Sequence, residues 1–256
     1  ELTPGDTVLE IGAGLGTLTE RLAREAGRVV AVELDARLIP ILQSVLSDLN
    51  NVTLIQGDIL TLDPAALLNP PSNLQSAICN LQSAICNFKV VANLPYYITS
   101  AVLRHLLEAR VRPRRMVITV QREVAERIVA RPGDMSLLAV SVQFYGRPQM
   151  LFRLRPGSFY PAPEVESAVV RIDAYETPPV PVEDVEGFFR VVRAGFAQRR
   201  KQLRNTLAAG LGFPPDEVAV RLQEAGIDPR RRAETLSLEE WAAVACALGS
   251  FQYKTL

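Results

Sequence analysis

The tetrapeptide Asn93-Leu94-Pro95-Tyr96 carries side chains well suited to holding a polar ligand. It follows the apolar run Val90-Val91-Ala92, which is typical of the end of a buried strand. Pro95 stops that strand, because proline fixes its own φ and biases the residue before it, Leu94, to an extended conformation. An amide oxygen, a main-chain carbonyl and an aromatic ring therefore meet at a strand's carboxyl end, where open α/β sheets bind ligands.

A glycine-rich turn near the start of the chain predicts a second part of the same edge. Thr7–Ile11 alternates like a strand, Gly12-Ala13-Gly14-Leu15-Gly16 follows it, and an apolar helical repeat then runs to Gly27. Glycines permit a tight turn and a close approach of the backbone to a ligand. Thr17 stands where the dinucleotide fingerprint requires its third glycine. With acidic Glu10 before it, the turn instead resembles the first motif of S-adenosylmethionine-dependent methyltransferases. A plain strand-to-helix turn is the alternative.

Acidic residues end the next two predicted strands. Residues 28–33 form a β-rich run that closes on Glu33 and Asp35, and 52–56 leads into Asp58. A carboxylate at the end of the second strand is placed to accept hydrogen bonds from ribose hydroxyls. Asp35 fits the alternative role of helix N-cap better than Glu33 does. Asp58 is a candidate acceptor for an adenine amino group, with a turn cap as its alternative.

Composition excludes several classes of protein. The chain has 256 residues, of which 48% are hydrophobic and 22% charged, and its formal net charge is zero. No apolar run approaches the roughly 18 residues of a membrane span. An odd cysteine count argues against a disulfide framework and fits a reducing compartment, so we expect a cytoplasmic protein. A single histidine excludes multi-histidine metal sites and disfavours a Ser-His-Asp triad, and we expect no metal.

Charge is distributed unevenly although it sums to zero. No Asp or Glu occurs from Gly187 to Pro215, whereas basic residues recur through that window. Such a one-sided cluster predicts either a solvated helix face or a phosphate-binding patch. The basic residues of the window are Arg190, Arg193, Arg199, Arg200, Lys201 and Arg204.

Strand and helix signals alternate through most of the chain and predict an α/β fold. The expected architecture is a Rossmann-like, mostly parallel sheet of about seven strands, followed by a small all-helical domain. Residues 149–154 and 167–172 read as a final antiparallel pair, and 136–145 favours a helix. Thr177-Pro178-Pro179-Val180-Pro181 predicts a linker. We therefore expect a first domain over 1–176 and a second over 177–256, with helices near 183–197, 199–211, 215–225 and 237–248.

A tandem copy interrupts the first domain. Residues 73–79 are repeated at once as 80–86, each copy reading Asn-Leu-Gln-Ser-Ala-Ile-Cys. Two copies are too few for a solenoid, and Pro70-Pro71 precedes them. We expect an exposed insertion here whose cysteines, Cys79 and Cys86, are not ligands.

Taken together, these motifs resemble one family, the small-subunit ribosomal RNA adenine N6,N6-dimethyltransferases. The resemblance spans nearly the whole chain. The blocks 200–207 and 232–241 are the most specific, because they separate this family from other methyltransferases that share the Asn93–Tyr96 pattern. The matching blocks are Leu9–Thr19, Val32–Asp35, Gly57–Leu60, Asn93–Ile98, Phe159–Val169, Arg200–Leu207 and Arg232–Trp241.

The resemblance implies a role for each candidate residue. Asn93 and the Leu94 carbonyl would receive the target amine, with Pro95 shaping the motif and Tyr96 and Phe159 stacking on the base. The Arg-rich block would hold RNA, and the partner would be the immature small ribosomal subunit. The protein would act as a monomer and would not bind membranes. The implied S-adenosylmethionine-binding residues are Glu10, Gly12, Gly14, Gly16, Glu33, Leu34, Asp58, Ile59 and Asn93. The implied RNA-binding residues are Arg199, Arg200, Lys201 and Arg204.

Three alternatives and one departure accompany this interpretation. The alternatives are a large-subunit adenine methylase, a non-catalytic RNA-binding assembly or transcription factor on the same fold, and, more weakly, a nicotinamide dehydrogenase. The intact Asn93–Tyr96 motif argues against a loss of catalysis. Family members carry a Lys-x-x-Gly-Gln-x-Phe segment before the first strand, which helps to close the donor site. This sequence begins without it, and we expect a native start ahead of Glu1.

Overall fold

The computed structural model describes residues 2–68 and 88–249, and the expected insertion at 73–86 lies outside them. The chain divides into two compact units. One comprises Glu1–Ala125 and Arg147–Tyr175, and is called the sheet unit below. The other comprises Glu126–Gly146 and Glu176–Leu256, and is called the helical unit. The break after Tyr175 lies next to the predicted linker, but residues 126–146 group with the helical unit rather than with the expected first domain.

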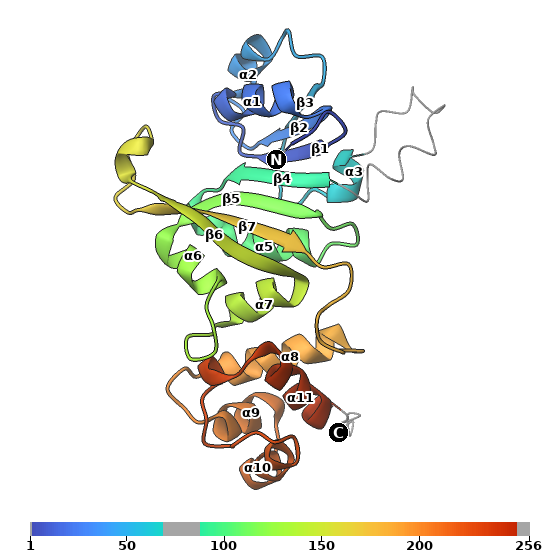
Figure 1. Ribbon diagram of the computed structural model, residues 1–256, viewed down its shortest axis with the longest axis vertical. Coiled ribbons are helices and arrows are strands. Elements are labelled where there is room, and N and C mark those ends of the chain that lie inside the picture. The colour runs from blue at the N-terminus through green and yellow to red at the C-terminus, as the bar shows by residue number, and fades with distance from the viewer. Residues whose placement is uncertain (1, 69–87, 250–256) are drawn as a thin grey trace. The chain divides into compact units, whose positions relative to one another are not determined.

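The sheet unit is built on one mixed sheet with the order β3-β2-β1-β4-β5-β7-β6 (Figure 1). The pairs among β1 to β5 are parallel, and β7 runs antiparallel to β5. This arrangement confirms the predicted Rossmann-like, mostly parallel sheet. The strands are β1 (Thr7–Ile11), β2 (Arg28–Glu33), β3 (Val52–Gln56), β4 (Phe88–Asn93), β5 (Arg115–Gln121), β6 (Gly146–Leu154) and β7 (Ser167–Ala174).

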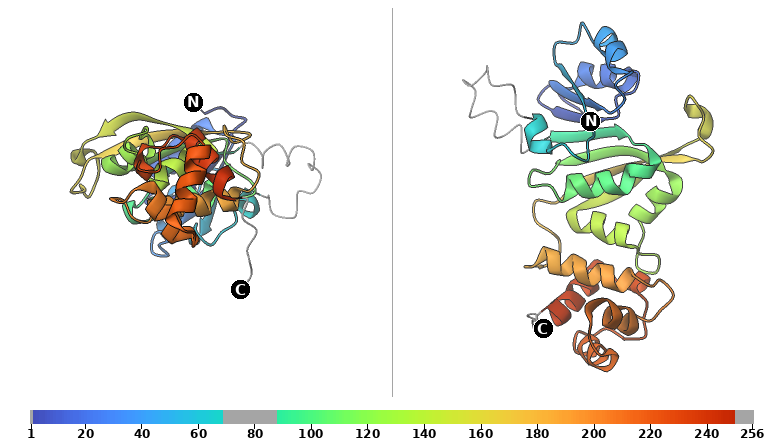
Figure 2. Two further views of the ribbon diagram at one scale, coloured as in Figure 1. Left: turned by 90° about the horizontal axis from the view of Figure 1, so that it is seen from below. Right: turned by 180° about the vertical axis from the view of Figure 1, so that it is seen from behind.

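Helices cover this sheet because the central strands are apolar on both faces, as buried parallel strands require. Val8, Leu9 and Val30 have no exposed surface. Leu22 and Ala23 on one stripe of α1 pack against β1 and β2. In the right panel of Figure 2, α5 crosses the face of the sheet turned toward the viewer. The helical segments here are α1 (Thr17–Glu25), α2 (Ile39–Val45), α3 (Pro64–Leu68), η2 (Tyr96–Ile98), α5 (Thr99–Leu107) and η3 (Pro156–Ser158), together with the start of α6 (Arg122–Ile128), whose residues after Ala125 group with the helical unit.

The helical unit has an aromatic core that explains why residues 126–146 belong to it. Phe144 stacks on Phe188 with ring centroids 4.9 Å apart, and Tyr145 stacks on Phe189 at 5.8 Å. These pairs join α7 to α8. Because aromatic side chains bury a large apolar area, α7 packs in the helical unit although it precedes β6 and β7 in the sequence. The helices are α7 (Leu137–Tyr145), α8 (Val185–Phe196), α9 (Leu203–Leu211), α10 (Pro215–Glu224), η4 (Ala233–Thr235) and α11 (Leu238–Gly249).

Two local features set the ends of these helices. Asp184 caps α8 by accepting a hydrogen bond from the Gly187 amide at 2.8 Å. The helix expected from residue 199 starts only at Leu203, because Gln202 is extended and the Leu203 amide donates to the Arg231 carbonyl at 2.7 Å. Residues 197–202 are therefore a connecting segment.

Among the described residues, no helix combines the length and apolarity that crossing a bilayer requires.

Candidate functional site

The carboxyl ends of three neighbouring parallel strands, β1, β2 and β4, meet at one edge of the sheet. Ile11 on β1 is paired with Val32 on β2 and with Ala92 on β4. The residues that follow these positions therefore lie side by side. A Cβ atom built on Gly12 would lie 3.8 Å from the carbonyl oxygen of Asn93, so the glycine turn and the Asn93–Tyr96 motif are neighbours. The structure brings together the two parts of the edge on which the sequence argument depends.

The glycine turn depends on left-handed backbone conformations. Gly12, Gly14 and Gly16 have φ values of 77°, 59° and 84°, which residues with a side chain rarely adopt. The Gly12 amide donates to the Val32 carbonyl at 2.9 Å, which fixes the turn against β2. A Cβ atom on Gly14 would meet nothing within 4 Å, so the turn is open on that side. Its backbone can approach a ligand closely.

Glu33 lies beside this turn with both carboxylate oxygens engaged. Oε2 accepts a hydrogen bond from the Gly14 amide and Oε1 accepts one from the Asp35 amide, each at 2.9 Å. The residue is 8% exposed. Each oxygen has a second lone pair, so the fixed carboxylate can also accept from hydroxyls of a ligand.

Asp35, the other acid of this strand end, is committed elsewhere. Its oxygens pair with the Arg37 guanidinium at 2.6 to 3.1 Å and accept from the Arg37 amide at 2.9 Å. The side-chain hydrogen bond to Arg37 lowers the pKa of Asp35 to about 2. Asp35 is not a helix N-cap, because α2 begins only at Ile39. Of the two acids, Glu33 is therefore the one that the geometry favours as the hydrogen-bond acceptor expected for ribose hydroxyls.

Glu10 is a buried carboxyl group without a partner. It has no exposed surface, and neither oxygen finds a hydrogen bond among the described residues. Burial raises the pKa of Glu10 to about 7, and the charge on Glu33 adds to this rise. The hydroxyl of Thr19 opposes it, although it stays outside hydrogen-bond geometry. Neither Glu10 nor Glu33 forms an ion pair with the described residues, and two such acids suit a positively charged ligand. S-adenosylmethionine carries an ammonium and a sulfonium group.

The other residues expected to contact the methyl donor, Asp58, Ile59 and Leu34, differ in hydrogen bonding and in exposure. Asp58 uses Oδ1 to accept from the Leu60 amide at 2.9 Å, which is the turn-forming role kept open above. Its Oδ2 accepts no hydrogen bond from the described residues and so keeps its capacity as an acceptor. Ile59 is 3% exposed and Leu34 is 62% exposed. Of these two, only Leu34 offers a substantial side-chain surface to a ligand.

The acceptor motif keeps its polar residue in the open. Asn93 ends β4 and is exposed, whereas the next side chain, Leu94, is 2% exposed. The Leu94 amide donates to the Thr119 carbonyl at 3.3 Å. Pro95 has φ −56° and ψ 131°, and a single 3₁₀ turn follows. Leu94 thus anchors the motif in the core while Asn93 faces solvent.

Tyr96 is held from a distant part of the chain. Its hydroxyl lies 2.7 Å from Oγ of Ser167, the first residue of β7. Phe159 lies half-buried on the loop between β6 and β7, which extends beyond the end of the sheet (Figure 1). An ion pair of 2.8 Å between Arg122 and Glu166 fixes the end of this loop. The aromatic residues expected at the target base therefore belong to structure anchored next to the acceptor motif.

Ser167 and Thr119 are supporting residues that the sequence argument did not identify. Neither is special by type. The β4–β5 pairing sets Thr119 beside Asn93, and the β5–β7 pairing, which joins Gln121 to Ser167, brings Ser167 to the same edge. The single histidine, His105, contacts the backbone, since its Nε2 lies 2.9 Å from the Leu62 carbonyl. Within the described residues no group of three or more His, Cys, Asp or Glu could hold a metal ion.

The basic residues expected to bind RNA lie in the helical unit. Arg199, Arg200 and Lys201 are exposed on the segment between α8 and α9, and are called the basic segment below. Arg199 approaches Glu234 only at 3.6 Å, with its own side chain 89% exposed. Arg204, in the first turn of α9, is half-buried. The basic segment is open to a polyanion.

An S-adenosylmethionine-dependent methyltransferase is the class of enzyme that this sheet, glycine turn and neighbouring acceptor motif define. A model of the ribosomal RNA adenine dimethylase family matches residues 1–248, and the chain belongs to that family.

Relatives and solved structures support the assignment. The chain is 48% identical over 241 residues to the ribosomal RNA small subunit methyltransferase A of Dehalococcoides mccartyi (strain CBDB1), covering 94% of this chain and 78% of the relative. It is 45% identical to the protein of the same name from Moorella thermoacetica, covering 97% and 84%. The structure resembles the 23S rRNA methyltransferase ErmE with a TM-score of 0.71 and 26% identity, covering 98% and 93%. A dimethyladenosine transferase from Plasmodium falciparum shares the fold, with a TM-score of 0.75 and 23% identity over 95% and 90%.

Proposed function

We propose that this protein transfers methyl groups from S-adenosylmethionine to N6 of adenosines in small-subunit ribosomal RNA, dimethylating two adjacent adenosines during ribosome maturation. The observation that carries the proposal is the contact between the two halves of the site. Gly12 of the donor turn lies against the Asn93 carbonyl. The names of the relatives supply the small-subunit RNA as substrate.

The donor side is assigned to the residues around the glycine turn. The backbone of Gly12, Gly14 and Gly16 would line the methionine moiety, and Glu33 would accept hydrogen bonds from the ribose hydroxyls. Glu10 and Glu33 would favour the positive charge of the donor. When bound, S-adenosylmethionine supplies an electrophilic methyl group. The preformed hydrogen bonds of Glu33 to Gly14 and Asp35 support this assignment, since they fix the carboxylate before any ligand arrives.

The acceptor side is assigned to Asn93 and Leu94. Adenine N6 is a poor nucleophile, because its lone pair is delocalised into the ring. The Asn93 side-chain oxygen and the Leu94 carbonyl would accept hydrogen bonds from the two N6–H groups and hold the amine pyramidal. Acceptors aligned in this way also stabilise positive charge that develops on the nitrogen. No strong base is required, since the proton can leave after the transfer.

Tyr96 and Phe159 are assigned to the target base. A base must leave its stack before its N6 can reach the sheet edge, which costs a few kcal/mol. Stacking on an aromatic side chain returns about 1–3 kcal/mol per base. Positioning of the amine can contribute up to roughly 7–11 kcal/mol of the barrier reduction. The hydrogen bond of Tyr96 to Ser167 supports this role, because it fixes the ring from outside the motif.

The helical unit is assigned to substrate choice. The basic segment Arg199-Arg200-Lys201 and Arg204 would hold RNA phosphates. Hairpin ends of RNA are recognised largely by their shape, which suits a unit that does not itself carry the methyl-transfer site. We further propose that the protein acts as a cytoplasmic monomer on the immature small subunit.

The proposal is tested with isolated immature small subunits and methyl-labelled donor. Mass spectrometry of the digested RNA should find N6,N6-dimethyladenosine with labelled methyl groups in small-subunit RNA. The matched control is the Asn93→Ala variant, which should bind the donor and leave the RNA unlabelled. Donor binding without methylation of any RNA by the wild type would instead support the non-catalytic RNA-binding alternative.

A second candidate is a methylase of the large subunit, favoured by the 26% identity to the 23S rRNA methyltransferase ErmE. The higher identity of 48% to a small-subunit enzyme weighs against it. Offering both subunits in one reaction decides between the two. Label confined to large-subunit RNA would overturn the small-subunit proposal.

A further inference from the structure

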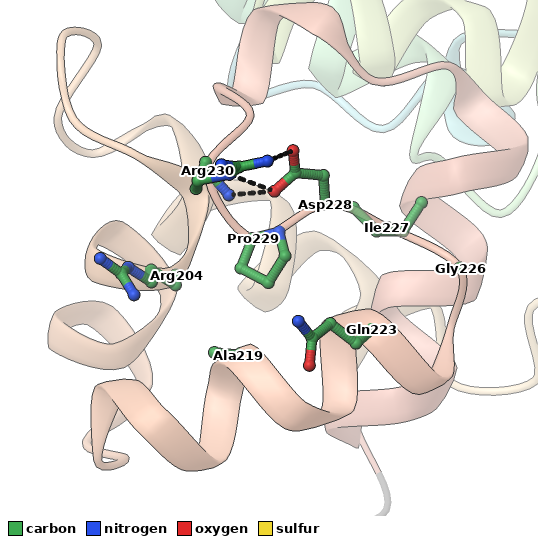
Figure 3. Close-up of a pocket in the computed structure, with 8 residues that line it drawn as sticks. All are labelled: Arg204, Ala219, Gln223, Gly226, Ile227, Asp228, Pro229 and Arg230. Atoms are coloured by element: carbon green, nitrogen blue, oxygen red, sulfur yellow. Dashed lines mark hydrogen bonds and ion pairs between the residues drawn. The ribbon is translucent and has the colours of Figure 1, made fainter.

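The helical unit contains a polar pocket of about 510 Å³ that the donor and acceptor sites do not use (Figure 3). The start of α9 forms one side, the face of α10 forms another, and the turn after α10 closes it. Pockets of roughly 300–1,000 Å³ are the size class that takes small organic ligands. The lining residues are Arg204, Ala219, Gln223, Gly226, Ile227, Asp228, Pro229 and Arg230.

The pocket is built in advance by backbone hydrogen bonds. The Arg204 amide donates to the Pro229 carbonyl at 3.2 Å, which joins the start of α9 to the turn. The Ile227 amide donates to the Leu222 carbonyl at 2.8 Å, and Gly226 has φ +76°. Only glycine adopts that conformation readily, so the turn leaves α10 sharply and exposes its inner side. The walls therefore need no rearrangement to receive a ligand.

Charge in the pocket is unbalanced toward the positive. Asp228 is committed to Arg230, whose guanidinium donates to both of its oxygens at 3.1 and 3.2 Å. Arg230 also donates its amide to Asp228 at 2.9 Å, and this pairing lowers the pKa of Asp228. The Nε of Arg204 is buried and has no hydrogen-bond partner among the described residues. The Arg204 side chain forms no ion pair with the described residues, so it is the lining cation that remains available to an anionic ligand.

The remaining walls combine an amide with apolar surface. Gln223 is exposed on α10, and Figure 3 shows its amide turned toward Pro229. Ile227 is 4% exposed and Pro229 is buried, so both are rigid parts of the wall. A guanidinium for a phosphate or a base plane, an amide for a base edge and an apolar wall together match one nucleotide.

We propose that this pocket receives one unstacked nucleotide of the RNA substrate, separate from the adenosine that is methylated. The inference rests on the proposed function, since it assumes an RNA substrate. The basic segment Arg199-Arg200-Lys201 directly precedes α9 and would hold the phosphates next to that nucleotide. The pocket would then let the helical unit select RNA that presents a bulged or looped-out base, which a continuous duplex cannot offer.

The test compares two hairpin RNAs that differ by a single bulged nucleotide. The bulge carries 2-aminopurine, whose fluorescence reports the environment of the base, and binding to the full chain is measured by titration. The wild type should bind the bulged hairpin about tenfold more tightly, within the range expected for one aromatic or guanidinium contact with a base. Its binding should also change the 2-aminopurine signal.

Variants locate the effect in the pocket. Gln223→Ala should remove most of the preference for the bulged hairpin, whereas Gln43→Ala, at an exposed helical glutamine of the sheet unit, should keep it. Arg204→Met should remove the preference and also weaken binding of both hairpins, since it deletes a phosphate contact. Arg21→Met, which removes the same charge from exposed α1, should keep the preference. Thermal melting of each variant confirms that it is folded.

Several outcomes would overturn the proposal. Equal binding of the two hairpins by the wild type is one, and a preference that survives both Gln223→Ala and Arg204→Met is another. Displacement of the bulged hairpin by millimolar mononucleotides, with no effect of the bulge on affinity, would show a site for free nucleotides instead. Methyl transfer to small subunits is measured separately. Its absence together with a retained bulge preference would count against the proposed function and not against the pocket.

Discussion

The donor and acceptor halves of the sheet edge are neighbours, yet they are built in opposite ways. On the donor side the chemical groups are buried, with Glu10 at 0% and Glu33 at 8% exposure. On the acceptor side they are more open: Asn93 is exposed, and Tyr96 and Phe159 are half-buried. A small charged donor gains from an enclosed site of fixed dipoles, whereas an RNA brings its own structure and needs an accessible edge.

The two halves also differ in what holds them. Local sequence fixes the donor side, where three left-handed glycines and the Gly14–Glu33 hydrogen bond act within one βαβ unit. Pairing with later strands fixes the acceptor side, where the Leu94 amide donates to the Thr119 carbonyl and the Tyr96 hydroxyl is hydrogen-bonded to Ser167. Damage on the donor side should therefore appear as lost donor affinity, and damage on the acceptor side as lost turnover.

Asn93→Ala should have the largest effect and should fall on turnover alone. The variant loses one of the two acceptors that hold the amine, and loss of a comparable contact in other enzymes costs about 10²–10³ in kcat. Donor affinity measured by calorimetry should change less than threefold, because the backbone carbonyl beside Gly12 remains. A rate near that of the wild type would contradict the claim that damage to the acceptor half appears as lost turnover.

Glu10→Gln should change how stability depends on pH. Burial raises the pKa of Glu10 from 4.5 to about 7 in the folded protein, so the unfolded chain loses its proton first. Stability is therefore lost as pH rises from about 4.5 to 7, by roughly 3 kcal/mol in total. In the absence of donor, Glu10→Gln should match the wild type near pH 4.5 and exceed it at pH 8.

Denaturant titrations at several pH values measure this difference. Glu25→Gln, which changes an exposed acid at the end of α1, is the matched control and should keep the pH dependence of the wild type. Saturating S-adenosylmethionine should narrow the gap between wild type and Glu10→Gln at pH 8, because its cationic groups compensate the buried charge. Parallel curves for wild type and Glu10→Gln would show that Glu10 does not carry a raised pKa.

The sequence was sufficient for the donor half and for the order of elements. The glycine turn, the acid at the end of β2 and the apolar strands each follow from local spacing, and the structure has them where expected. The supports of the acceptor half could not be found in this way. Thr119 meets the motif through β4–β5 pairing and Ser167 through β5–β7 pairing, and no property of a serine or threonine signals such a partner.

The grouping of α7 illustrates the same limit in the helical unit. The prediction of a helix over 136–145 is confirmed, and its contacts group it with the helical unit rather than with the first domain expected over 1–176. A sequence pattern shows that Phe144 and Tyr145 need burial, and does not show that Phe188 and Phe189 provide it. Linker composition indicates a domain boundary in the sequence. It does not show which segments on one side of that boundary pack with the domain on the other side.

Glu33→Ala should weaken donor binding by about 10- to 100-fold, with kcat at saturating donor changed much less. The substitution removes the acceptor for the ribose and also leaves the Gly14 and Asp35 amides without their partner. Equilibrium binding and a kcat–KM comparison for the donor measure the split. Asp35→Ala is the matched control, because that carboxylate is paired with Arg37 and should leave donor affinity nearly unchanged. An equal loss in both variants would remove the distinction drawn between the two acids.

Tyr96→Phe should have the smallest effect, because it keeps the ring and removes only the hydroxyl that lies 2.7 Å from Ser167. A single hydrogen bond of this kind contributes about 1 kcal/mol, so kcat/KM for RNA should fall roughly fivefold. The double variant with Ser167→Ala should lose no more than Tyr96→Phe alone, since both changes break the same bond. Tyr97→Phe, at the exposed neighbouring ring, is the control and should be silent in this cycle. Additive losses for positions 96 and 167 would mean that the acceptor half is held locally, as the donor half is, and the contrast between long-range and local support would fail.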